Sequence, residues 1–187
     1  MALKQISQNG SVRMPPQNLD AEKSVLGSLM LDVNAINVVI DILTPDDFYS
    51  QKHSIIYDVM IELYGKKDPI DVLSVSSRLK EKKKLKQAGD NSYVTELVNS
   101  VPTASNVKHY AEIVHKKRIL RDLIESSGHI SQLGYDEEND VDELLDEAEK
   151  KIFAIARNSL KQKFQSVKSA LGEAWERIER LHKSKGE

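Results

Sequence analysis

Five histidines are the side chains in this sequence most able to do acid–base or metal chemistry, and they lie at positions 53, 109, 115, 129 and 182. His109 and His115 are six residues apart, which places them on different faces of a helix. No His-Glu-x-x-His motif occurs, and no histidine belongs to a recognisable Ser/His/Asp arrangement. The acidic pair Glu137-Glu138 falls in a predicted polar turn. We therefore predict no catalytic residue and no metal site, and ordinary surface or boundary roles for the histidines.

Cofactor chemistry is equally poorly supported. The chain has no cysteine, which removes disulfides, thiolate nucleophiles and Cys-ligated metals. A phosphate-binding loop needs Gly-x-x-x-x-Gly-Lys-Ser/Thr, but the only Gly-Lys pair, Gly65-Lys66, lacks both the first glycine and the following hydroxyl residue. We predict that this chain binds no nucleotide, holds no cofactor and is not an enzyme by itself.

Two basic clusters could contact nucleic acid. The first runs from Lys80 to Lys86, and the second comprises Lys116, Lys117, Arg118 and Arg121. The first equally suits the exposed end of a helix, where cations interact favourably with the dipole. The second could instead pair with a neighbouring acidic helix. Because 27 basic and 29 acidic residues leave a net charge of −2, stand-alone binding of nucleic acid is disfavoured, but an independent helical nucleic-acid-binding protein remains the alternative interpretation.

The elements that position these residues are predicted to be helices only. Hydrophobic residues make up 40% of the chain, aromatic residues 5% and charged residues 30%, which favours aliphatic helix faces with solvated outer surfaces. After a polar tail over 1–17, short helices over 18–102 form a compact head. Asn18 and Asp71 are suited to cap helices, and Thr44-Pro45-Asp46-Asp47 predicts a helix start that continues to about Gly65.

The residues from 103 to 157 predict a long antiparallel helical hairpin. One helix begins after Ser105 or Asn106 and reaches about Leu133, and a polar turn over 135–140 follows. The next helix has apolar residues at alternating spacings of four and three, which is typical of the seam with a partner helix. The predicted seam consists of Val141, Leu145, Ala148, Ile152 and Ile155.

The last part of the chain predicts a polar linker over 158–165 and a separate amphipathic helix over 166–187. Its apolar stripe is formed by Val167, Leu171, Trp175, Ile178 and Leu181. Because a polar linker separates this stripe from the head, we expect it to dock on another subunit. The N-terminus is polar and no apolar run approaches the length of a membrane span, so we expect a cytoplasmic protein without a membrane partner.

Several ordered motifs resemble the N-terminal domain of DnaB-type replicative DNA helicases, from about residue 16 to 185. The opening motif runs from Pro16 to Gly27, with Asp20 where the family usually has Glu. Further blocks are Phe48-Tyr49 with His53, Pro69-Ile70-Asp71 with Ser74, and Ala104-x-Asn106-Val107 with Tyr110-Ala111. The Gly89-Asp90-Asn91 turn departs from the commoner Gly-Gly form.

This resemblance implies a role that residue patterns alone do not reach. Such helicases are hexameric rings that unwind DNA with ATP, and their N-terminal domains pair into a collar, a trimer of dimers. The collar serves as a platform for a DnaG-type primase and influences the binding of a helicase loader. The resemblance further implies that the helix over 166–187 precedes an ATPase domain, where ATP and Mg²⁺ would act, and that DNA contacts the full-length ring.

Overall fold

The computed structural model describes residues 14–101 and 103–160, and within these ranges it has seven α-helices, one short 3₁₀ helix and no strand. The predicted all-α class is thereby confirmed. The elements are α1 (Leu19–Leu31), α2 (Ala35–Val39), η1 (Pro45–Asp47), α3 (Gln51–Lys66), α4 (Val72–Glu81), α5 (Asp90–Asn99), α6 (Val107–Leu133) and α7 (Val141–Leu160).

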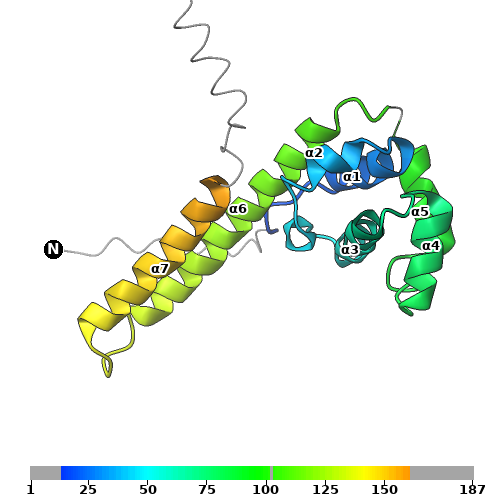
Figure 1. Cartoon of the computed structure of the whole chain (residues 1–187). Coiled ribbons are helices and arrows are strands. Elements are labelled where there is room, and N and C mark those ends of the chain that lie inside the picture. The colour runs from blue at the N-terminus through cyan, green and yellow to red at the C-terminus, as the bar shows by residue number, and fades with distance from the viewer. Residues whose placement is uncertain (1–13, 102, 161–187) are drawn as a thin grey trace, which may run out of the picture.

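Helices α1 to α5 and the first turns of α6 surround one hydrophobic core (Figure 1). α1 contributes Val25, Leu26 and Leu29 to it, and all three side chains are buried. α3 adds buried residues at helical spacing, among them Ile56 and Met60. Burial of a side chain of this size contributes roughly 1.5–3 kcal/mol, so this core supplies most of the driving force for folding.

Local capping signals begin two of the helices as predicted. Asn18 Oδ1 accepts a hydrogen bond from the backbone N–H of Ala21 at 3.0 Å, and Asp71 Oδ1 accepts one from Ser74 at 2.8 Å. The capping box of Thr44 and Asp47 is also present, but it closes only the three-residue turn η1. The prediction of one helix continuing from Pro45 is wrong, because the chain is extended at Phe48 and α3 begins separately at Gln51.

α1 and α5 approach each other unusually closely at Gly27. A Cβ atom placed there would lie 2.6 Å from Val101 Cγ2 and would also collide with the backbone carbonyl oxygen of Leu97. Only glycine therefore fits this position, and the absence of a side chain sets how near the two helices can pack.

α6 leaves the head and continues outward, and α7 returns antiparallel beside it, so the two form the hairpin seen in Figure 1. The buried residues of α6 are Val107, Ala111 and Val114, all in its first turns, where it still belongs to the head. α7 continues to Leu160, three residues into the segment predicted as linker. Residues 1–13 of the predicted tail over 1–17, the rest of the predicted linker and the predicted helix over 166–187 lie outside the described residues.

Candidate functional site

A buried polar cluster joins three helices of the head. Glu22 of α1 and His53 of α3 are each only 1% exposed, and Glu22 Oε2 lies 2.6 Å from His53 Nδ1. The other ring nitrogen, Nε2, lies 2.7 Å from the hydroxyl of Tyr93 in α5. All these polar atoms are satisfied when Nδ1 donates to Glu22 and Nε2 accepts from Tyr93.

The same carboxylate also caps α3. Glu22 Oε1 accepts the backbone N–H of Tyr49 at 2.8 Å, and Oε2 accepts that of Ser50 at 3.2 Å. These N–H groups lie at the N-terminal end of α3, where backbone N–H groups have no carbonyl acceptor within the helix itself. In the sequence Glu22 is simply an acidic residue in the first turn of α1, so its role as a cap for a helix that begins 29 residues later was missed.

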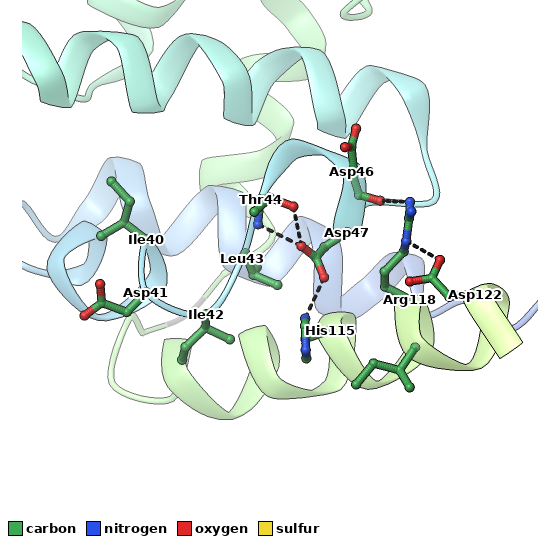
Figure 2. Close-up of a pocket in the computed structure, with 11 residues that line it drawn as sticks. Ile40, Asp41, Ile42, Leu43, Thr44, Asp46, Asp47, His115, Arg118 and Asp122 are labelled. Carbon is green, nitrogen blue, oxygen red and sulfur yellow. Dashed lines mark hydrogen bonds and ion pairs between the residues drawn. The ribbon is translucent and has the colours of Figure 1, made fainter. Parts of the chain in front are cut away.

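A second polar cluster fixes α6 to the head (Figure 2). His115 Nδ1 lies 2.7 Å from Asp47 Oδ1, and the other oxygen of Asp47 accepts hydrogen bonds from the N–H and hydroxyl of Thr44. Burial alone would raise the pKa of the Asp47 carboxyl, but the hydrogen bonds from His115 and Thr44 outweigh it and hold this pKa below its ordinary value. Asp47 is therefore a charged anchor between η1 and α6.

Two arginines of α6 extend this junction. Arg118 donates to the Asp46 carbonyl at 2.6 Å and pairs with Asp122 at 2.6 Å. Arg121 donates to the carbonyl oxygens of Pro16 and Asp47 at 3.0 and 2.6 Å. Both guanidinium groups are thus committed within the chain, which argues against the interpretation of this cluster as phosphate contacts.

The junction borders a cavity of about 190 Å³. Sites for drug-sized ligands have volumes of roughly 300–1,000 Å³, so this cavity is small for a substrate or cofactor. Its lining is visible in Figure 2 and consists of Ile40, Asp41, Ile42, Leu43, Thr44, Asp46, Asp47, His115, Arg118, Ile119 and Asp122. Among the described residues, no group of three or more His, Cys, Asp or Glu side chains is arranged to hold a metal ion.

The lysines from 80 to 86 divide into two sets. Lys82 Nζ lies 2.9 Å from Glu62 and 3.4 Å from Asp58, so it binds α4 to α3. Lys84 lies 3.9 Å from the same Asp58. The other three, Lys80, Lys83 and Lys86, are exposed and form no ion pair within the described part of the chain.

The predicted hairpin seam divides between covered and uncovered positions. Ala148 and Ile155 are half-buried, whereas Val141, Leu145 and Ile152 are 68%, 63% and 51% exposed in the single chain. At 3.6 residues per turn, the half-buried side of α7 is rotated by roughly 60° from the exposed members of the stripe. α6 thus covers one edge of an apolar stripe that is too wide for a single partner helix, and the role of the five residues as a seam stays a prediction.

Both helices of the hairpin present further apolar side chains to solvent. We call this set, with the exposed stripe positions, the hairpin apolar face. It comprises Leu120, Leu123 and Ile124 of α6 and Val141, Leu145, Ile152 and Phe153 of α7. Exposed apolar groups in such numbers are characteristic of interaction surfaces.

The predicted docking stripe Val167, Leu171, Trp175, Ile178 and Leu181 lies outside the described residues. Of the helices that are described, none is both long enough and apolar enough to cross a bilayer.

Comparison with known proteins gives consistent matches. Residues 14–116, more than half of the chain, match the model described as "DnaB-like helicase N terminal domain". The chain is 42% identical over 175 residues to the replicative DNA helicase DnaC of Bacillus subtilis. This match covers 94% of the present chain but only 38% of that protein. It is 39% identical to the replicative DNA helicase DnaB of Geobacillus stearothermophilus, of which it covers 39%. The chain therefore spans less than two-fifths of the length of these relatives.

Solved structures show the same fold. The crystal structure of the N-terminal domain of DnaB helicase from Mycobacterium tuberculosis matches with a TM-score of 0.73 and 40% identity, over 75% of this chain and 99% of that one. A DnaB-like replicative helicase described together with its interactions with primase matches with a TM-score of 0.62 and 28% identity, over 87% of this chain and 35% of that one.

Proposed function

Because this chain belongs to the family of DnaB-like helicase N-terminal domains, we propose that it works as the collar of a replicative DNA helicase. In this role it joins subunits through its hairpin into dimers, and three dimers form the collar of a hexamer. It also presents the surface to which a DnaG-type primase binds, and it influences the binding of a helicase loader. ATP, Mg²⁺ and DNA act on the full-length ring and not on this domain alone.

The observation that carries the assembly role is the hairpin apolar face. Phe153 is 64% exposed and Leu145 63%, although both lie in a helix packed on its neighbour. Burial of each such side chain contributes roughly 1.5–3 kcal/mol, which is the kind of driving force that association needs. A second hairpin is a fitting cover, because two such faces packed together make a four-helix bundle.

The rigid junction between head and hairpin supports the same role. Asp47, Arg118 and Arg121 fix the direction in which α6 leaves the head. A collar of identical subunits needs one reproducible angle between these parts, because symmetric assembly repeats every error in it.

The primase platform is the less direct part of the proposal. It is supported by the match to a helicase described with its interactions with primase. The exposed surfaces of the head and hairpin are the candidates for this contact, and we assign no individual residue to it.

The alternative, an independent nucleic-acid-binding protein, loses half of its second cluster because Arg118 and Arg121 are engaged in the junction. It would require the remaining lysines to bind DNA with an affinity that falls steeply as salt is added. Failure of the isolated chain to bind DNA, together with capture of a primase C-terminal domain, is the expected result.

The assembly role is tested by measuring the mass of the chain in solution by light scattering after size exclusion. At physiological salt, where contacts between exposed charges are screened, we expect a dimer for the natural sequence and a monomer for the double variant Leu145→Asp/Phe153→Asp. The matched control is Val33→Asp, which adds charge at another exposed apolar position, on the head. A monomeric natural chain, or a double variant that dimerises as well as the control, would contradict the proposal.

A further inference from the structure

A second unpartnered surface lies on the head, along the outer side of α4. A groove between α4 and the start of α5 is lined by Val72, Leu73, Ser76, Ser77, Lys80 and Asn91. Leu73 is 77% exposed, so the groove has an uncovered apolar element. We call these six residues the α4 groove.

Lys80 in the α4 groove, and Lys83 and Lys86 just after α4 in the chain, carry positive charges that the head itself does not use. Lys82 and Lys84 neutralise acidic residues of α3, but Lys80, Lys83 and Lys86 have no ion pair within the described part of the chain. One exposed ammonium group beside Leu73 in the groove, with two more following α4 in the chain, suits a partner that is acidic and carries an apolar side chain.

The tip of the hairpin has this chemistry. Residues 136–149 contain nine Asp or Glu and no Lys or Arg. Within this segment only Asp146 and Glu147 form ion pairs among the described residues, with Lys150 and His129. Tyr135 at its start is 86% exposed and is not part of the hairpin apolar face, so an aromatic side chain accompanies the negative charge.

The two surfaces lie at opposite ends of the molecule. Figure 1 shows the α6–α7 loop at the far end of the hairpin, while α4 lies on the side of the head that faces away from it. One chain therefore cannot bring its own tip to its own groove. A contact between different surfaces of two copies is heterologous, and such contacts generate rings or open chains.

We infer that the acidic hairpin tip of one copy binds in the α4 groove of another copy. Glu138 and Glu143 then face Lys80 and Lys83, and the ring of Tyr135 covers Leu73. The inference rests on the proposed function, because hairpin pairing supplies the dimers that this second contact links into a larger assembly. It assigns the Lys80–Lys86 cluster to a protein surface instead of a phosphate backbone.

Charge reversal tests this contact. The groove variant is Lys80→Glu/Lys83→Glu, and the tip variant is Glu138→Lys/Glu143→Lys. Sedimentation velocity at low salt over a range of concentrations should show species larger than the dimer for the natural chain. Each variant alone should stop at the dimer, with the larger species weakened roughly tenfold or more, because like charges then face each other.

The decisive sample is an equimolar mixture of the two variants. The reversed tip meets the reversed groove with opposite charge, and the natural tip and groove also remain complementary, so the larger species should return in the mixture. Added salt should weaken it, as for any exposed charge contact. The matched control is Lys52→Glu/Lys108→Glu, which reverses two exposed lysines elsewhere and should assemble like the natural chain.

Three results would overturn the inference while leaving hairpin pairing intact. These are a natural chain that stops at the dimer, variants that assemble normally, and a mixture that does not recover. Binding of a single-stranded oligonucleotide that the groove variant loses and the tip variant keeps, without any change in assembly, would instead assign the lysines to nucleic acid. A natural chain that stays monomeric would contradict the proposed function itself, and the Leu145→Asp/Phe153→Asp variant distinguishes that case.

Discussion

Glu22 and His53 meet in the interior of the head, with Glu22 Oε2 2.6 Å from His53 Nδ1 although 31 residues separate them in sequence. This contact joins α1 to the first turn of α3. Because the same carboxylate accepts the N–H groups of Tyr49 and Ser50, one side chain both caps α3 and fixes its position against α1.

Replacing this carboxylate should destabilise the head. Glu22→Gln keeps the shape but exchanges one acceptor oxygen for a donor, so at least one of the donors His53 Nδ1, Tyr49 N–H and Ser50 N–H loses its partner. We expect a loss of roughly 1–3 kcal/mol in the free energy of unfolding, measured by urea denaturation with circular dichroism. Glu149→Gln, at an exposed position without an ion pair among the described residues, should change it by less than about 0.5 kcal/mol. Equal urea midpoints for the two variants would contradict this role of Glu22.

Two glycines in long helices should respond in opposite directions to alanine. Gly27→Ala places a methyl group against Leu97 and Val101, so α1 and α5 must separate, at a cost of about 1–3 kcal/mol. Gly128→Ala meets no atom within 4 Å and should stabilise α6 by about 0.5–1 kcal/mol. Thermal unfolding distinguishes the two, and a stabilised Gly27→Ala variant would show that the helices are not packed this closely.

The junction between head and hairpin should depend on pH through Asp47. Because the pKa of this carboxyl is lowered in the folded state, its stabilisation is fully present above the ordinary Asp pKa of about 4 and is lost as pH falls through the lowered value. Asp47→Asn should therefore cost roughly 1.5–3 kcal/mol at pH 7. The difference between the natural chain and the variant should shrink below about pH 4. A difference that stays constant from pH 7 to 3 would argue against a charged anchor.

The apolar stripe of the predicted helix over 166–187 should act in assembly and not in folding of the head. Charging it with Leu171→Asp/Ile178→Asp should leave thermal unfolding of the head unchanged, because a polar linker separates the stripe from the core. In the full-length parent the same change should weaken ring formation, as measured by native mass spectrometry. Rings that form equally well would count against the docking role.

Local signals in the sequence predicted much of this fold. The side chains of Asn18 and Asp71 cap helices by accepting the backbone N–H three residues later. Apolar residues at intervals of three or four place Val75 and Leu79 in the core. Such features depend on neighbours in the chain and are readable without coordinates.

The polar clusters could not be predicted in the same way. Glu22 is an ordinary first-turn acid in sequence, and only the tertiary fold brings it to His53 and Tyr49. Likewise, Thr44 and Asp47 form the expected capping box, but it belongs to η1 alone. The next helix, α3, is capped by the distant carboxylate of Glu22, and the chain between η1 and α3 is extended at Phe48. A signal was nevertheless present, since His53 lies three and four positions before Ile56 and Tyr57, on the apolar face of α3, where a buried polar residue requires a partner.

Residue spacing alone also could not predict how much of the apolar stripe of α7 is covered by α6. Apolar positions at intervals of three and four identify a face, but not how much of it one neighbour covers. In the structure Ala148 and Ile155 lie on the covered edge, and Leu145 and Ile152 lie beyond it.

No described side chain of α7 up to Arg157 is buried, and this has a consequence for how firmly the hairpin holds its shape. In the isolated chain α7 has no buried side chain over this stretch to oppose local opening. Its backbone amide hydrogens should therefore exchange with solvent deuterium well before those of α1 and α3. Pairing with another copy should slow hydrogen–deuterium exchange along α7 and leave the exchange rates in the interior of the head unchanged. The second copy thus supplies much of the hairpin's stability against local unfolding.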